Sequence, residues 1–98
     1  MSWYAARLLY ESVVSDSKTV APLCEESTIL IEAQDEEDAR RKANRLGKQR
    51  GHSYRNPYGE KVAWKFVNVI ELQDLCEDRI ENGTEVFSRL FRKGAKGE

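Results

Sequence analysis

The sequence contains few of the residues from which common metal and catalytic sites are built. Among its 98 residues are one histidine, two cysteines, two prolines and six glycines. One histidine cannot form a metal site built from several histidines, and Cys24 and Cys76 do not have the spacing of a zinc motif. The scarcity of proline and glycine argues against a disordered chain. These absences favour a folded domain without a metal or cofactor.

The chain also lacks the segments that direct proteins into or across membranes. Residues 1–7 have neither the basic stretch nor the apolar core of a signal peptide. No apolar run approaches the length of a membrane span. With both thiols expected to be reduced, we expect a cytoplasmic protein. No phosphate-binding glycine loop, GxSxG or CxxC occurs, so we predict no catalytic residues and favour a protein that is not an enzyme.

Hydrophobic alternation predicts four strands, residues 2–14, 23–33, 61–72 and 84–92. Three predicted core faces are formed by Tyr4, Ala6, Leu8 and Tyr10, by Ile29, Ile31 and Ala33, and by Val62, Trp64, Phe66, Ile70 and Leu72, where Asn68 interrupts the last. Residues 15–22 and 51–60 are expected to be loops, with a turn at Asn56-Pro57. The acidic residues 73–81 are compatible with a short helical turn.

Residues 34–50 are predicted to form a helix. Ala39, Ala43 and Leu46 recur at helical spacing and mark its buried side, and two alanines there allow a close approach to a sheet. Asp35 suits the N-cap, and Asp38 follows three positions later as a variant of the capping box. Gly47 and Gly51 are equally good ends for this helix.

The predicted element order is β-β-α-β-β. This order indicates a single α+β domain over residues 1–93, with a four-stranded antiparallel sheet and one helix on one face, followed by a disordered tail over residues 94–98. Several strands carry apolar residues on both sides, so loops, a second copy or a partner protein must cover the other face. We favour a homodimer or a protein partner, with Trp3 and Trp64 as apolar anchors if they are exposed.

Positive charge is concentrated in one part of an almost neutral chain. Residues 40–65 carry nine basic side chains and one acid, Glu60, although the net charge of the whole chain is -1. Helix electrostatics accounts for the basic run 40–42, because residues 36–38 are acidic and lie four positions earlier. The basic side chains between residues 45 and 61 have no such local partner and remain candidates for binding.

Residues 52–59 (HSYRNPYG) combine a histidine, two tyrosines, an arginine and an amide, as functional loops often do. The candidate partner-binding residues are Arg45, Lys48, Arg50, His52, Tyr54, Arg55, Tyr58 and Lys61. A protein-interaction module is the favoured interpretation. Nucleic-acid binding through residues 41–61 is the first alternative, and a small enzyme acting around His52 is the second. Tyrosines that only pin the loop to the sheet would explain the same residues without a function.

Four segments together resemble a known family. They are residues 3–12 (WYAARLLYES), 25–33 (EESTILIEA), 52–60 (HSYRNPYGE) and 83–89 (GTEVFSR). In this order they are similar to a small bacterial family catalogued as domain of unknown function 4288, over roughly residues 3–91. The resemblance implies a bacterial one-domain protein, and it assigns no activity and no site residue.

Overall fold

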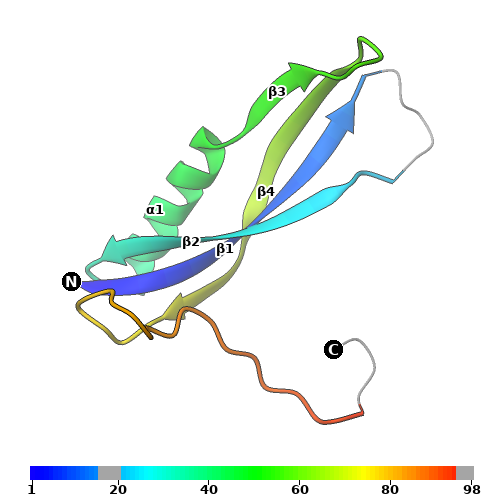
Figure 1. Cartoon of the computed structure of the whole chain (residues 1–98). Helices are drawn as coiled ribbons and strands as arrows, with labels where there is room; N and C mark the ends of the chain where they lie inside the picture. The colour runs from blue at the N-terminus through cyan, green and yellow to red at the C-terminus, as the bar shows by residue number, and fades with distance from the viewer. Residues whose placement is uncertain (16–20, 95–98) are drawn as a thin grey trace.

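The computed structural model describes residues 1–15 and 21–94 and contains one antiparallel sheet with one helix on a face (Figure 1). The sheet has four strands in the order β2-β1-β4-β3. The elements are β1 (Ser2–Val14), β2 (Cys24–Ala33), α1 (Glu36–Gln49), β3 (His52–Arg55) and β4 (Lys61–Asp74). The predicted α+β class and the β-β-α-β-β order are confirmed. The centre of the predicted loop 15–22 and most of the predicted tail 94–98 lie outside the described residues.

The fourth strand is not the one that the sequence predicted. Residues 84–92 were expected to form it, and that prediction is wrong because they lie in no strand. Instead β3, in the predicted loop 51–60, pairs with β4 at the edge of the sheet. The turn at Asn56 explains this pairing: its Oδ1 accepts from the backbone N–H groups of Tyr58 and Glu60, both at 3.0 Å. The predicted Asn56-Pro57 turn is therefore confirmed, within a β-hairpin.

The core lies between the sheet and α1, where the alternation had placed it. The predicted faces of β1 and β2 are confirmed, and Ala39 and Ala43 of the helix pack against them without exposed surface. Alanines leave little side-chain bulk between the two layers, so the helix approaches the strands closely. The buried residues of this cluster are Tyr4, Ala6, Leu8, Tyr10, Ile31, Ala33, Ala39 and Ala43.

Two irregularities in β4 change which of its residues face the helix. The pairing of β1 with β4 shifts between Arg7 and Leu8 and again between Leu9 and Tyr10, so that Val67 and Ile70 have no partner on β1. A β-bulge of this kind moves the following residues to the other face. Val69 therefore packs on the core, whereas Ile70 is 39% exposed. The predicted core position of Ile70 is wrong, and the bulges explain the interruption at Asn68.

The predicted start of the helix is confirmed, and its end is settled. Asp35 is the N-cap and accepts a hydrogen bond of 2.8 Å from the backbone N–H of Asp38. In return Asp38 Oδ2 accepts from the backbone N–H of Gln34 at 3.1 Å, which makes a variant of the capping box that reaches the residue before the N-cap. The helix continues through Gly47, and Arg50 is its C-cap, so Gly51 follows the end. The acidic residues 73–81 form no helix.

The cap makes stability depend on pH. The hydrogen bond from Gln34 holds the pKa of the Asp38 carboxyl below its ordinary value of 3.8, and Lys42 and Arg41 act in the same direction. A carboxylate whose pKa is lowered by folding stabilises the protein above its unfolded-state pKa, and this contribution is lost as the pH falls through the folded-state pKa. We therefore expect Asp38→Asn to flatten the loss of thermal stability as the pH falls from about 5 to below 3.8. Circular dichroism melts across this range measure it.

The matched control for this titration is Glu37→Gln. Glu37 is an exposed neighbour that makes no hydrogen bond or ion pair among the described residues. We expect this variant to leave the N-cap hydrogen bonds in place, because Glu37 contributes no atom to them. Equal slopes for the Asp38 variant and the wild type would show that the cap does not titrate with folding.

The chain itself covers part of the second sheet face. After β4 the backbone first stays beside the start of β1, where Trp3 N–H donates to the Glu77 carbonyl at 3.2 Å and Leu75 N–H donates to the Trp3 carbonyl at 2.9 Å. Further on, the Arg7 guanidinium lies 4.0 Å from the ring centre of Phe87. Ala5 is buried on this face, whereas Leu30 and Val67 remain substantially exposed. Among the described residues, no helix has the length and apolarity that crossing a membrane requires.

Candidate functional site

The helix covers only about half the length of its sheet face. A helix as long as α1 spans about 21 Å, whereas β1 and β4 each span more than about 40 Å. Figure 1 shows both strands continuing beyond the helix end towards the β3–β4 turn. In this uncovered part Trp64 lies opposite Ser12 on one side and His52 on the other. Side chains that would be core under a longer helix are accessible here.

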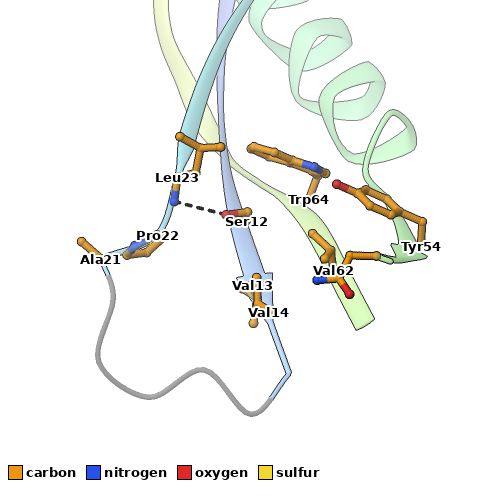
Figure 2. A pocket seen from close by; sticks show the side chains of 10 residues that line it. Ser12, Val13, Val14, Ala21, Pro22, Leu23, Tyr54, Val62 and Trp64 are labelled. Atoms are coloured by element: carbon orange, nitrogen blue, oxygen red, sulfur yellow. Dashed lines mark hydrogen bonds between the residues drawn. The ribbon is translucent and has the colours of Figure 1, made fainter. Parts of the chain in front are cut away.

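A groove of about 460 Å³ lies on this uncovered part of the face. Figure 2 shows Tyr54 and Trp64 on one side of β1, with Leu23 and Pro22 on the other. We call it the Trp64 groove, and the residues that line it are Ser12, Val13, Val14, Ala21, Pro22, Leu23, Tyr54, Asn56, Val62 and Trp64. Leu23 N–H donates to the Ser12 hydroxyl at 3.2 Å. This bond holds the segment before β2, which forms one side of the groove, against β1, which forms its floor.

A second hollow of about 260 Å³ adjoins the groove and shares Trp64 with it. It is lined by Tyr10, Glu25, Ser27, Arg50, His52 and Trp64. The His52 ring stacks on Tyr54 with centres 6.1 Å apart, and its Nδ1 lies 3.4 Å from the Arg50 carbonyl. His52 and Glu25 share the hollow, but no hydrogen bond or ion pair joins them in the described part of the chain. This geometry gives His52 no acidic partner of the kind that general-base catalysis uses.

The structure brings three of the predicted site residues together. Arg50 and His52 line the hollow, and Tyr54 lines the groove. The other five predicted residues, Arg45, Lys48, Arg55, Tyr58 and Lys61, line neither. Arg55 donates to the Gly59 carbonyl at 2.8 Å and lies opposite Lys61 in the β3–β4 pairing. Tyr58 is 87% exposed at the tip of the turn.

The sequence did not reveal that Leu23, Ser12 and Val62 would line one groove. The sequence pattern assigns Trp64 to a core face or, if it is exposed, to an apolar anchor. The sequence did contain one indication of an uncovered surface. A strand rises about twice as far per residue as a helix, so a helix cannot cover the full length of a strand with a similar number of residues. That comparison predicts an uncovered end, although it does not predict which side chains meet there.

Ion pairing separates the basic side chains into two groups. In the first turns of the helix, Arg40 pairs with Glu36 at 3.7 Å, and Lys42 pairs with Asp38 at 3.3 Å. The prediction that local acids account for this run is confirmed, although Arg41 pairs with Asp38 and not with Glu37. No acid lies within ion-pair distance of the remaining candidates among residues 1–15 and 21–94: Arg45, Lys48, Arg50, Arg55 and Lys61. These cations are exposed around the helix end and the β3–β4 hairpin.

Comparison with known proteins gives a family and no activity. The model of the domain of unknown function DUF4288 matches residues 3–88, which include the helix and all four strands except Ser2, the first residue of β1. No curated protein and no solved structure matches the chain. The resemblance seen in the sequence is thus confirmed over most of its length, and the chain belongs to the DUF4288 family.

Proposed function

We propose that this chain is a non-enzymatic protein-interaction module, a single domain over residues 1–93, that binds a partner protein in the Trp64 groove. The supporting observation is that apolar side chains stay accessible on the sheet face that forms the core elsewhere. Tyr54 is 49% exposed and Leu23 is 69% exposed, and both flank the partly buried Trp64. Tyrosine and tryptophan in a pocket are the residues on which binding energy most often depends.

The charges around the groove define the chemistry of the partner. Arg50 borders it on the helix side, and Arg55 and Lys61 lie at the hairpin end. A partner segment that inserts an apolar side chain between Trp64 and Leu23 would meet these cations with its flanks. Acidic flanking residues would therefore be favoured, and they would increase the rate of association. Cys24 and Cys76 are both free and exposed, which fits a cytoplasmic subunit of a bacterial complex.

The two tyrosines of the β3–β4 hairpin provide a matched test. A fluorescein-labelled peptide with a central leucine and phenylalanine between glutamates serves as the probe, and its lysine-flanked counterpart serves as the negative control. We expect Tyr54→Ser to weaken binding about tenfold, because it removes one wall of the groove. Tyr58→Ser should leave the affinity unchanged, because Tyr58 lies outside the groove. Fluorescence anisotropy titrations measure both, and equal effects of the two variants would contradict the proposed site.

Nucleic-acid binding is the second candidate, favoured by the exposed cations around the helix end and the hairpin that have no ion pair within the described ranges. Tyr54 and Trp64 offer accessible rings on which bases would stack. Arg50 in the adjoining hollow and Lys61 at the hairpin end would contact phosphates. The sequence pI of about 5.9 argues against a dedicated binder. Salt separates the two candidates: phosphate contacts make affinity fall steeply with salt, whereas an apolar groove responds little. Filter binding at low salt that retains no single- or double-stranded oligonucleotide would eliminate this candidate.

A further inference from the structure

The segment over residues 84–92 has the pattern of a strand and no strand partner in the structure. In an extended chain its side chains would point alternately to two faces, with Val86, Ser88 and Leu90 on one face and Phe87 on the other. This alternation is typical of a half-buried strand. After Thr84 its backbone makes one hydrogen bond with the residues that the structure describes, from Ser88 N–H to the Gln73 side chain at 3.4 Å. The segment therefore has unpaired backbone groups that a β-sheet edge can satisfy.

Only the first half of this segment is held against its own sheet. Phe87 stacks on Arg7, and Arg7 is also within ion-pair distance of Glu26 and Glu71, at 3.8 and 3.9 Å. Beyond Ser88 the apolar side chains face solvent: Leu90 is 98% exposed and Phe91 is 62% exposed. In Figure 1 the chain passes under the sheet and then runs away from it. Exposed apolar residues in a strand-like segment indicate a missing neighbour.

The free edge of β2 has the complementary pattern. Ser12 N–H donates to the Leu23 carbonyl at 2.9 Å, so odd-numbered residues of β2 direct their backbone groups to β1. The even-numbered residues then direct theirs outwards, away from the sheet. Lys42 Nζ donates to the Glu32 carbonyl at 3.0 Å, which confirms the outward direction and occupies that one position. The outward groups left for a further strand belong to Cys24, Glu26, Thr28 and Leu30.

The charges of residues 84–93 are complementary to those of the β2 edge. β2 contains Glu25, Glu26 and Glu32 and no basic residue. The segment and the residue after it carry Arg89, Arg92 and Lys93 against one acid, Glu85. Opposite charges on neighbouring strands stabilise pairing, and like charges oppose it. Because the acidic edge and the basic segment belong to the same chain, a second copy supplies both partners at once.

We propose that residues 84–92 of one copy give up the contact of Phe87 with Arg7 of their own chain and add as a strand to the β2 edge of a second copy, and that the second copy does the same in return. Such an exchange is self-complementary and closes as a two-fold dimer. It buries Leu90 and Phe91, satisfies the edge of β2 and removes an exposed edge that favours aggregation. The Trp64 groove takes no part in the exchange, so this inference is independent of the proposed function.

A proline at Thr28 tests the strand pairing. The Thr28 N–H points away from β1, so Thr28→Pro should leave the β1–β2 bonds intact while removing a donor to an added strand. We expect light scattering of the wild-type chain to rise from 11.3 kDa towards twice that mass over micromolar concentrations. The variant should stay a monomer with an unchanged circular dichroism spectrum. A wild-type chain that remains at 11.3 kDa, or a variant that dimerises normally, would overturn the proposal.

Charge reversal tests the partners without a proline. The first variant, Glu25→Lys with Glu32→Lys, has a basic edge, and neither glutamate is in an ion pair within the described residues. The second, Arg89→Glu with Arg92→Glu, has an acidic segment. Each alone should dimerise at least about tenfold more weakly, because like charges then face each other. An equal mixture should restore the dimer, since both pairings become complementary; a mixture that stays monomeric would contradict the assignment.

Discussion

Replacing Leu8 by alanine should lower the free energy of unfolding by about 2–5 kcal/mol. Leu8 is the largest fully buried side chain, and it lies on β1 at the centre of the sheet, between Ser27 of β2 and Val69 of β4. Its neighbours across the core include Ala39 and Ala43, which are too small to fill the space that it would leave. Small side chains and a continuous backbone sheet limit collapse of the cavity, so the cost should lie in the upper part of that range.

The next residue along β1 provides the control for this substitution. Leu9 has the same side chain but lies on the opposite sheet face, where it is only partly buried. We expect Leu9→Ala to cost less than half as much as Leu8→Ala, because less apolar surface is returned to water. Urea denaturation followed by circular dichroism gives both values, provided that the slope of the transition is unchanged. Similar costs for the two variants would show that the core does not lie between the sheet and α1.

Gly47→Ala should destabilise the protein although alanine is the better helix former. A Cβ at Gly47 would lie 2.7 and 2.8 Å from Cδ1 and Cζ of Phe66, and closer still to its Cε1. Three ring atoms at these distances mean that the whole ring must move. The ring is held by an edge contact to Tyr10, with centres 5.7 Å apart, and Tyr10 donates a hydrogen bond of 2.8 Å to the Gly47 carbonyl. Burial raises the pKa of the Tyr10 phenol above 10.0, so this donor stays protonated at neutral pH.

The sign of the Gly47 effect depends on two opposing terms. Alanine should gain about 1 kcal/mol from helix propensity. Overpacking costs about 1–3 kcal/mol, and displacement of the Tyr10 hydrogen bond adds about 1–3 kcal/mol for a buried hydroxyl left without a partner. We therefore expect a net loss of about 1–5 kcal/mol in the free energy of unfolding, measured by urea denaturation.

Two further variants make the Gly47 result specific. Arg45→Ala, on the exposed side of the same helix, should change stability by less than about 0.5 kcal/mol. In a Phe66→Leu background, which removes the ring, Gly47→Ala should become neutral or stabilising, so the two substitutions are strongly non-additive. A loss that is independent of Phe66 would place the cause in the helix backbone and contradict the packing argument.

Local patterns determined much of this fold. The core faces of β1 and β2 followed from strict alternation, and the buried side of α1 followed from Ala39 and Ala43, because a regular strand or helix fixes the direction of every side chain. The capping pair Asp35 and Asp38 was also identified from its spacing, since its hydrogen bonds join residues close in sequence. In each case the physical cause lies within a few positions of the residue concerned.

Pairing between distant segments decided what the patterns left open. The bulges at Val67 and Ile70 arise only where β4 meets β1, and they moved Val69 into the core. Residues 84–92 have a strand pattern but no strand neighbour among the residues that the structure describes, whereas the polar β3 became a strand because the Asn56 turn placed it beside β4. Alternation indicates what a segment can form, and a hydrogen-bonding partner determines whether it does.

The candidate site also combines features that local sequence patterns predict with features that depend on contacts between distant segments. The family, the α+β class, the element order and the excess of positive charge after the helix could be predicted from the residues alone, because these depend on residue identity and short-range periodicity. Only the tertiary structure placed Tyr54, Trp64 and Leu23 around one groove and left Arg55 and Tyr58 outside it. The physical reason is a mismatch in length: the strands extend beyond the helix that covers them, and residues from separate strands meet where that cover ends.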